Sequence, residues 1–343
     1  MAKKLLSANK IVKKTISKRR LFNGAKFYLL MVSGGSDSVA LAYIMNELAP
    51  KKFAIMHLNH NLRPDSKEDA EFVEALAKHF GVKYFGYSEH VREAAEALHK
   101  NIEDMGRTLR YTYANATLNQ LPNNTKIVTA HTADDRIENF YMRSIVGTGP
   151  GGFASMSYQN ENIIRPLLDC SKESLIEYLE SINKPFKDKD GKLWHEDSTN
   201  EDTNYFRAYV RHEIIPLAKR QNPQIINNLT NSMNLIADES AYIERQVKEL
   251  TNKHISFNEK SFTIAPDFKT EDLVLKRRAI YNALIEVFPK GTRIETKSIT
   301  SILESTEQSN YTDNIQENYS VHSNKNGSLI QPMDDYRKSR NRL

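Results

Sequence analysis

Cysteine is nearly absent from this chain, which holds one cysteine, Cys170, among 343 residues. A single thiol excludes an intrachain disulfide framework and any zinc or iron–sulfur site that needs several cysteines. No run of about 18 apolar residues occurs, so the sequence predicts no helix that spans a membrane. Both absences are typical of a protein of the reducing cytoplasm.

Acidic residues are missing from the first 36 positions, which carry nine Lys and Arg before the first acid, Asp37. Apolar residues recur among these lysines in the pattern of a basic amphipathic helix. A removable transit peptide would be rich in arginine, whereas lysine dominates here and the segment leads directly into an apolar stretch. A solvated helix docked on a sheet and a helix that contacts phosphate remain equally open.

Apolar and charged residues make up 39% and 27% of the chain, an ordinary composition for a folded soluble protein. Apolar segments predict buried strands, and helical periodicity fills the intervals between them. The predicted strands are 27–32, 53–59, 82–87 and 126–130, and the predicted helices are 39–48, 68–80, 91–118 and 134–146. This alternation indicates an α/β fold with a doubly wound, mostly parallel sheet, whose binding residues lie just beyond the strand ends.

The alternation ends at residues 147–152, which read GTGPGG and predict a loop. Ser171 is a plausible N-cap for a following helix. After Pro216, long amphipathic helices are predicted at 229–250 and 271–288. The predicted domains are an α/β domain at 1–216, a mainly helical domain at 217–330 and a flexible basic tail at 331–343.

Glycines and serines surround Asp37 directly after the first predicted strand, in the stretch Ser33-Gly34-Gly35-Ser36-Asp37-Ser38. Backbone N–H groups of such a loop, together with the N-terminus of the next helix, can converge on an anion. Glycine lets a phosphate approach the backbone, and serine hydroxyls add donors. Asp37 is placed to hold a Mg²⁺ ion that bridges phosphate oxygens, so the sequence predicts a polyphosphate site here.

Other glycine-rich motifs do not fit this loop. A Walker loop places a lysine after its glycines, and no lysine follows here. A dinucleotide fingerprint needs a third glycine, and the hydrolase elbow G-x-S-x-G is broken by Ser38 at its final position. A plain tight turn remains the alternative to a phosphate site.

The stretch from Ser33 to Ser38 resembles the SGGxDS loop of the N-type ATP pyrophosphatases, which cleave ATP between its α and β phosphates. Later segments resemble, in the same order, the motifs of tRNA(Ile)-lysidine synthetases. These segments are His57 to Arg63, Asn101 to Tyr111, Thr129 to Glu138, Gly147 to Met156, Arg165 to Leu168, Glu196 to Asn200 and Arg207 to Pro216. The chain departs from the family pattern at Asn59 (often aspartate), at Asn139 (usually threonine) and at Val146 (usually arginine).

The resemblance implies a Rossmann-like N-type ATP pyrophosphatase domain at 1–216 and a tRNA-binding role for 217–330. It implies that ATP, with Mg²⁺, adenylylates the wobble cytidine of an isoleucine tRNA with a CAU anticodon. Free L-lysine would then displace AMP from C2 of that cytidine. No membrane partner is implied, and the sequence leaves the oligomeric state open, a homodimer included.

The motifs supply the candidate site residues. The resemblance implies that ATP is bound by Ser33, Gly34, Gly35, Ser36, Asp37, Ser38, His131 and Asp134, with Asp37 as the magnesium ligand. It implies catalytic roles for Asp37, Arg107, Arg110, Asp135 and Glu138, lysine binding by Asp135 and Glu138, and tRNA contacts at Arg63, Arg207 and Arg211.

Asp135 and Glu138 are three residues apart, so a helix places both carboxylates on one face. One of them is the candidate base for the amine proton, because only a neutral amine attacks. A solvated acidic face is the plain alternative. Likewise, Asp134 could cap its own helix, and Glu103 could form an ordinary ion pair with Arg107 one turn later.

Three other functions stay open. Enzymes that thiolate tRNA cytidine carry a cysteine pair, which this chain lacks. A small-molecule amidotransferase would need neither the segment from Arg207 to Arg211 nor a basic second domain, where Lys276, Arg277 and Arg278 stand together. An inactive RNA-binding relative would not need to keep the intact loop and the acidic pair, so the sequence favours lysidine synthesis.

Overall fold

The computed structural model describes residues 7–63, 66–195 and 206–340, except for the side chains of residues 339 and 340. The chain divides into two compact units, residues 1–236 and 237–343. The sequence predicts this boundary about 20 residues earlier. The difference arises because Leu229 and Met233 pack with Ile137 and Val210 in a small apolar core of the first unit.

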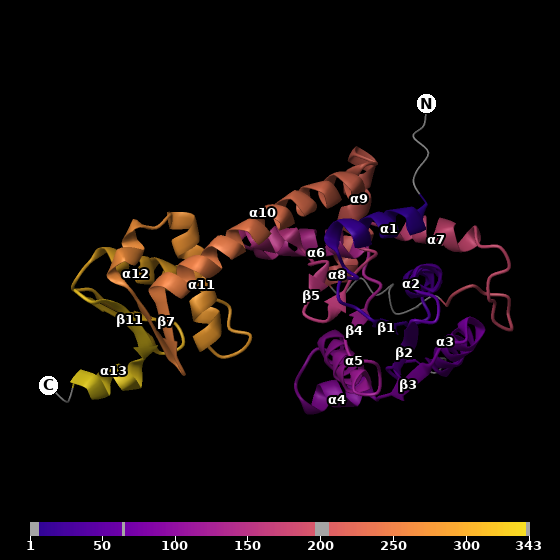
Figure 1. Ribbon diagram of the computed structural model, residues 1–343, viewed down its shortest axis with the longest axis horizontal. Coiled ribbons are helices and arrows are strands. Elements are labelled where there is room, and N and C mark those ends of the chain that lie inside the picture. Colours follow the sequence, from indigo (N-terminus) through magenta and orange to yellow (C-terminus); the bar gives the residue numbers. More distant parts are fainter. Residues whose placement is uncertain (1–6, 64–65, 196–205, 341–343) are drawn as a thin grey trace. The chain divides into compact units, whose positions relative to one another are not determined.

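The first unit is built on a six-stranded sheet with the strand order β3-β2-β1-β4-β6-β5 (Figure 1). All neighbouring strands are parallel except β5 and β6. This order confirms the doubly wound, mostly parallel sheet, because the chain turns back at β1 to add strands on its other side. The strands are β1 (Phe27–Met31), β2 (Phe53–Asn59), β3 (Tyr84–Ser88), β4 (Thr125–Val128), β5 (Gln159–Asn160) and β6 (Ile163–Ile164).

Helices cover both faces of this sheet because successive strand residues point to opposite sides. Leu30 and Ile55 belong to the larger core, which also contains residues from α1 (Ala8–Arg19), α2 (Ser36–Leu48), α3 (Ser66–Phe80) and α7 (Lys172–Glu180). Leu29 and Met56 belong to the other core, under α5 (Ile102–Leu118). The predicted basic helix is confirmed as α1, which buries Val12 and leaves its lysines exposed.

The helix predicted at 91–118 is two helices, α4 (Val91–Ala97) and α5. His99 between them has a left-handed backbone with a φ of 51°, which ends α4. The side chain of Asn101 then accepts the N–H of Glu103 at 2.8 Å and caps the new helix. As a result, Arg107 and Arg110 lie on α5 and not on the helix that begins at Val91.

The remaining helices of the first unit follow β4. They are α6 (Ala133–Val146), the 3₁₀ turn η1 (Pro150–Ala154), α8 (Phe206–Tyr209), the π-helical turn η3 (Val210–Ile214), α9 (Ile215–Gln221) and the start of α10 (Ile225–His254). Ser171 caps α7 as predicted, since its side chain accepts the N–H of Ser174 at 3.2 Å.

The second unit combines helices with a five-stranded antiparallel sheet, in the order β7-β8-β11-β10-β9. Its elements are the end of α10, β7 (Ile255–Asn258), β8 (Ser261–Ile264), the 3₁₀ turn η4 (Pro266–Thr270), α11 (Leu273–Val287), α12 (Thr296–Glu307), β9 (Thr312–Ile315), β10 (Tyr319–Asn324), β11 (Gly327–Pro332) and α13 (Met333–Arg340). The helices predicted at 229–250 and 271–288 are present as α10 and α11, whereas the antiparallel sheet was not predicted. Its core contains Phe262, Phe268 and Leu284, all fully buried. The tail predicted from residue 331 instead begins with the end of β11 and helix α13.

Cys170 is fully buried in the larger core of the first unit. Burial raises the pKa of its thiol to about 12, so the side chain remains a neutral thiol. None of the helices in the described part of the chain is long and apolar enough to cross a membrane.

Candidate active site

The loop after β1 has a conformation fixed by its own hydrogen bonds. Gly34 has a φ of 100°, a value that residues with a Cβ atom rarely adopt. Ser38 Oγ accepts the N–H groups of Ser33 and Gly34 at 3.2 Å each and donates to the carbonyl of Gly35 at 2.9 Å. Helix α2 begins directly afterwards, and its N-cap Gly35 supplies no capping side chain. The first N–H groups of α2 are therefore available to an anion, as the sequence predicts.

Asp37 lies on the first turn of α2. Its Oδ1 atom is buried without a hydrogen-bond partner in the described structure. Burial, and next the charge of Asp135, raise the pKa of Asp37 to about 7, while the ammonium of Lys172 opposes the shift. A bare carboxylate is costly here, and a cation that binds Oδ1 would remove this cost.

A magnesium ion fits this environment only together with a bound substrate that supplies phosphate oxygens. Among the described residues, no group of three or more His, Cys, Asp or Glu is arranged to hold a metal ion. Magnesium commonly binds proteins through one or two carboxylates and takes its other oxygens from water and substrate phosphates. The single unpartnered oxygen of Asp37, beside the phosphate loop, meets that requirement.

His131 and Asp134 follow β4, at the same carboxyl edge of the sheet as the loop. His131 Nδ1 lies 2.8 Å from the hydroxyl of Thr129. Burial lowers the pKa of His131 to about 4, so its imidazole is neutral at physiological pH. Asp134 accepts the backbone N–H of Lys172 at 2.8 Å and does not cap its own helix, which Thr132 caps instead.

Acidification is expected to weaken the fold through His131. The unfolded chain binds a proton at this side chain near pH 6.5, whereas the folded chain binds it only near pH 4. The contribution of His131 to the free energy of unfolding should therefore be largest above pH 6.5 and fall by roughly 2–3 kcal/mol as the pH drops to 4. Urea unfolding of the wild type and His131→Asn at both pH values measures this fall, which the variant should lack. The same fall in both proteins would contradict the expectation, and the exposed His90→Asn serves as the control.

The acidic pair on α6 is occupied by two arginines in this structure. Arg207 Nη2 lies 2.7 Å from Asp135 Oδ1, and Arg207 Nε lies 2.7 Å from Glu138 Oε2. Arg211 Nε lies 2.6 Å from the other oxygen of Glu138. Although burial lowers it, the pKa of Arg207 is raised overall by Asp135 and Glu138. Residues that the sequence assigns to separate lysine and tRNA sites thus form a single charged cluster.

Glu138 is the buried centre of this cluster, with 3% of its side chain exposed, while the two arginines are about one-third exposed. The arginines are brought to it by α8 and the π-helical turn η3, which follow each other without a break. Such π-helical turns are frequent at functional sites. The motif from Glu196 to Asn200, just before α8, lies outside the described residues.

Arg107 and Arg110 have no ion-pair partner among the carboxylates of the described residues. The expected alternative, a pair between Glu103 and Arg107, is not formed, because Glu103 instead contacts Arg207 at 3.2 Å. Burial lowers the pKa of Arg110. After burial, both guanidinium groups also lower the pKa of His131, which places their charge close to this side chain. Two arginines without carboxylates are suited to bind phosphate oxygens.

Arg63 lies behind the phosphate loop, where its Nη2 contacts Asp69 Oδ2 at 2.7 Å. His195, which no sequence motif singles out, lies beside it. His195 donates its backbone N–H to the carbonyl of Gly34 at 3.0 Å, and its Nδ1 lies 2.7 Å from Asp69 Oδ1. His195 and Asp69 are 126 positions apart in the chain, so no local pattern relates them.

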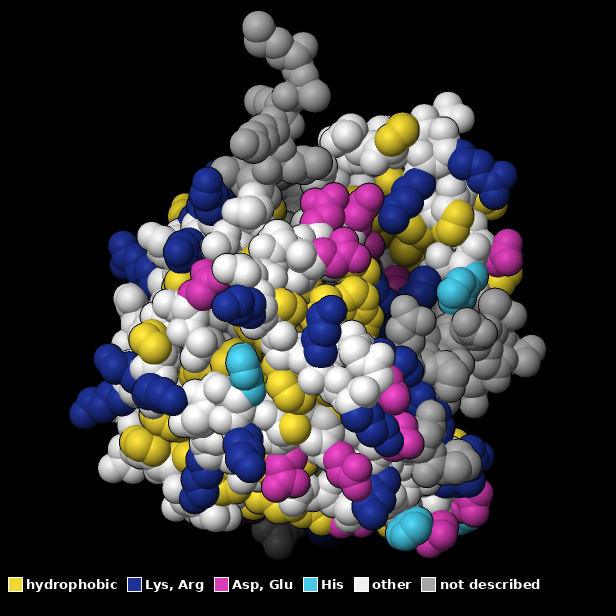
Figure 2. Space-filling view, turned by 90° about the vertical axis from the view of Figure 1, so that its right-hand side faces the viewer, with side chains coloured by type: hydrophobic (Ala, Val, Ile, Leu, Met, Phe, Trp, Pro, Cys, Tyr) yellow, Lys and Arg dark blue, Asp and Glu magenta, His cyan; other side chains and the backbone are white. Residues whose placement is uncertain are grey.

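The Lys and Arg side chains on the face drawn in Figure 2 do not mark a site for a nucleic acid. Figure 2 shows Lys and Arg side chains spread over one face among Asp and Glu, without a continuous basic patch. In the second unit, Lys276 is buried and bonds to Glu307 at 3.0 Å, and Arg278 pairs with Glu244 at 3.4 Å. Of the three consecutive basic residues in that unit, Arg277 is exposed, Arg278 is partly buried and Lys276 is buried.

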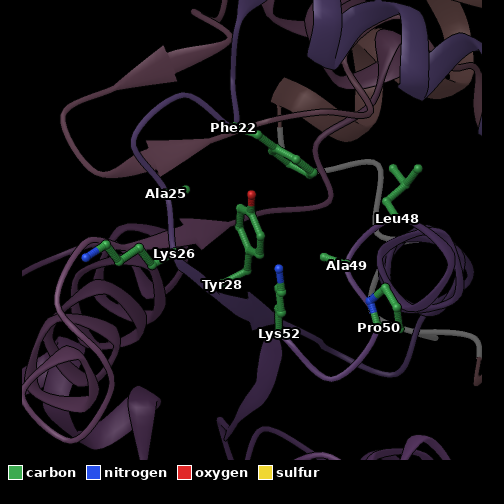
Figure 3. Close-up of a pocket in the computed structure, with 8 residues that line it drawn as sticks. All are labelled: Phe22, Ala25, Lys26, Tyr28, Leu48, Ala49, Pro50 and Lys52. Atoms are coloured by element: carbon green, nitrogen blue, oxygen red, sulfur yellow. The ribbon is translucent and has the colours of Figure 1, made fainter.

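A pocket of about 510 Å³ lies away from this site (Figure 3). It is lined by Phe22, Ala25, Lys26, Tyr28, Leu48, Ala49, Pro50 and Lys52. These residues stand at the amino end of β1 and at the last turn of α2. The phosphate loop is at the opposite end of both elements, so this pocket is separate from the candidate active site.

Comparisons with known proteins agree with the arrangement of the loop and the sheet. The PP-loop domain family matches residues 6–218. A bifunctional protein TilS/HprT of Listeria innocua is 29% identical over 295 residues, which are 84% of this chain and 44% of that protein. A tRNA(Ile)-lysidine synthase of Nostoc sp. is 34% identical over 248 residues, which are 70% of this chain and 68% of that protein.

A solved structure, the U34-tRNA thiolase NcsA of Methanococcus maripaludis, shares the fold with a TM-score of 0.50 and 15% sequence identity. The match covers 67% of this chain and 78% of that one. The present chain spans less than half the length of the Listeria relative and about two-thirds of the Nostoc one. The match to more than half of the chain, and the likeness to the Nostoc protein, show that the chain belongs to the PP-loop family and, within it, to the tRNA(Ile)-lysidine synthases.

Proposed function

We propose that this protein is an ATP-dependent ligase that joins L-lysine to C2 of the wobble cytidine, position 34, in isoleucine tRNA with a CAU anticodon. The observation that carries the proposal is the position of Asp37. The Oδ1 atom of this buried carboxylate has no hydrogen-bond partner in the described structure and stands at the phosphate loop, and after burial the charge of Asp135, from the acidic pair, raises its pKa most. A nucleotide-phosphate site and an amine site are thus adjacent at the carboxyl edge of one sheet.

In the first step, the cytidine O2 attacks the α phosphorus of ATP, and pyrophosphate leaves. The open N–H groups at the start of α2 bind the two outer phosphates. Arg107 and Arg110 neutralise the charge that develops on the transferred phosphate. When bound at Asp37, Mg²⁺ supplies charge neutralisation of the phosphate oxygens.

In the second step, the ε-amine of lysine attacks C2 of the adenylylated cytidine, and AMP leaves with the O2 oxygen. The amine must be neutral to attack, so its ammonium form first loses a proton to Asp135 or Glu138. A second proton leaves the nitrogen once the C–N bond has formed. Neutral His131 contacts the nucleotide through a hydrogen bond and not through a charge.

The binding of lysine to Asp135 and Glu138 requires Arg207 to leave them. Its guanidinium makes the charge-assisted bonds that an ammonium would make at the same oxygens. Arg207 and Arg211 are also the groups that we propose for contact with tRNA phosphates, together with Arg63 and the second unit. Phosphate contacts would draw Arg207 away from the carboxylates and leave them to lysine.

Arg207→Ala is therefore expected to tighten the binding of lysine in the absence of RNA by about tenfold, because a competing charged group is removed. Equilibrium dialysis with radiolabelled lysine measures the dissociation constant directly. Arg220→Ala, on the exposed face of α9, is the matched control and should leave the constant unchanged. Weaker binding in Arg207→Ala would mean that this arginine helps to hold lysine, and would contradict the competition.

The function itself is tested by incubating the protein with radiolabelled lysine, ATP and transcribed tRNA. Label should enter a CAU-anticodon isoleucine tRNA only when ATP is present, with one AMP and one pyrophosphate released per lysine. No incorporation under these conditions would overturn the proposal. Transfer of sulfur would favour the thiolase alternative, and transfer of ammonia would favour the amidotransferase. The sequence has one cysteine, Cys170, and not the cysteine pair of the thiolases. We place the reaction in the cytoplasm, where tRNA and ATP are available.

A further inference from the structure

The back of the phosphate loop is held by a segment far away in the sequence. The N–H of His195 donates to the carbonyl of Gly34 at 3.0 Å. The carbonyl of Gly34 and the N–H of Gly35 belong to one peptide group, which is trans, so they point in opposite directions. Fixing the carbonyl on the side of His195 therefore turns the N–H of Gly35 toward the opposite, phosphate-facing side of the loop.

The N–H of Gly35 is only weakly engaged within the protein. Its contact to Ser33 Oγ is 3.4 Å long, beyond the usual range for an N–H···O bond. A phosphate oxygen can replace such a partner at little cost. The orientation of this peptide group is thus directly relevant to ATP binding, and His195 is the residue that sets it from behind.

The imidazole of His195 fixes the position of its own backbone. Its Nδ1 lies 2.7 Å from Asp69 Oδ1, and its Nε2 lies 3.2 Å from Asp188 Oδ2. Each nitrogen thus faces a carboxylate oxygen, which accepts a hydrogen bond from any nitrogen that carries a proton. The ring also packs on Phe72 of α3, with 4.6 Å between ring centroids.

Both carboxylates are themselves anchored. Asp69 accepts a bond from Arg63 at 2.7 Å on its other oxygen. Asp188 accepts the N–H groups of Asp190 and Lys192 at 2.9 and 2.7 Å, which closes a tight turn. The ring of His195 is therefore held between two fixed acceptors, one on α3 and one on the turn.

We propose that His195 is a positioning residue for ATP, which holds the Gly34–Gly35 peptide in the orientation that binds the nucleotide's phosphates. This inference rests on the proposed function of the phosphate loop. His195 does not touch the reacting atoms, so it should affect the binding of ATP and neither the binding of lysine nor the chemical steps.

The test compares His195→Ala, His195→Gln and Asp188→Asn with the wild-type protein. Calorimetric titration with a non-hydrolysable ATP analogue and Mg²⁺ gives the dissociation constant, and steady-state assays give KM for ATP and lysine. His195→Ala should weaken the binding of the analogue, and raise KM for ATP, by about tenfold. The values of kcat and of KM for lysine should stay within twofold of wild type. His195→Gln keeps one donor and should recover part of the loss. Asp188→Asn keeps an acceptor for the ring and should weaken the binding of ATP by only a few fold.

His90→Ala is the matched control, because His90 is an exposed histidine at the start of α4. An unchanged ATP constant in His195→Ala, or an equal loss for ATP and lysine, would overturn the inference. If His195→Ala fails to fold, His195→Gln and Asp188→Asn decide by the same criterion. Failure of the wild type to bind ATP would instead refute the proposed function, so the two outcomes are distinct.

Discussion

Asp37→Asn is expected to reduce the rate of lysine incorporation by about 10²–10³-fold, the usual cost of removing one group that stabilises developing charge. Asparagine keeps the size of the side chain and removes the negative charge that binds a cation beside the phosphates. The Oδ1 atom of Asp37 has no protein partner in the described structure, and an asparagine oxygen can still accept the hydrogen bond that Ser36 makes to this side chain. Single-turnover release of pyrophosphate from ATP and tRNA measures the first chemical step.

A matched control makes the result specific to the site. Asp104→Asn alters an exposed acid in the first turn of α5 in the same way and should leave the rate within twofold. The thermal midpoint of Asp37→Asn should be no lower than that of the wild type, because a charge whose burial is unfavourable is removed. A rate within tenfold of wild type would show that the phosphate loop works without this carboxylate, and would remove the main support for the proposed function.

Arg136→Met is expected to destabilise the first unit by roughly 3–5 kcal/mol, the range found when one partner of a buried charge network is removed. The side chain of Arg136 is fully buried. It donates to Asn234 Oδ1 at 2.9 Å, to the hydroxyl of Tyr158 at 3.1 Å and to the carbonyl of Ala154 at 3.3 Å. Methionine fills much of the volume but leaves these acceptors without their donor.

The same network reaches a second charge, that of the partly buried Asp169. Asp169 Oδ1 accepts the hydroxyl of Tyr158 at 2.5 Å, and its other oxygen accepts Thr15 Oγ1 of α1 at 2.6 Å. Arg136 Nη1 lies 3.8 Å from Asp169 Oδ1. Loss of Arg136 therefore also removes a cation that stabilises the charge of Asp169, which adds to the cost.

Urea unfolding followed by tryptophan fluorescence measures this loss. The chain has one tryptophan, Trp194, which packs against the core of the first unit and so reports on that unit. Arg143→Met is the control on the same helix, because within the described part of the chain Arg143 makes only one side-chain hydrogen bond, to the carbonyl of Gly152 at 2.9 Å. That variant should lose about 1 kcal/mol or less. Equal losses in both variants would show that the buried network contributes no more than a surface hydrogen bond.

The sequence predicts the first unit well because its signals are local. A strand such as Phe53–Asn59 is buried along its whole length and reads as one apolar run. The phosphate loop combines a strand end, glycines and a helix start within a few residues. By contrast, strands such as Tyr319–Asn324 in the second unit mix Ser, His and Asn with few apolar residues, so their pairing is not visible in the sequence.

The candidate site is predictable only in part, for a related reason. The residues at the strand ends follow from the fold, but the partners of each charge come from distant segments. Arg207 and Glu138 are 69 positions apart, and nothing in either motif indicates that they pair. Arg136 did leave a signal, because it lies beside Ile137 on the apolar stripe of α6, where a charge is expected only with buried partners.

The burial of Cys170 opens a practical route to observing this protein at work. Maleimide and nitroxide reagents react with thiolates, and a neutral thiol enclosed in the core is out of their reach. Any new cysteine that is placed on the surface can therefore carry a fluorophore or spin label without removal of the native one. Substitution of exposed Tyr209, two residues after Arg207, would put such a reporter on the segment that we propose to move before lysine enters.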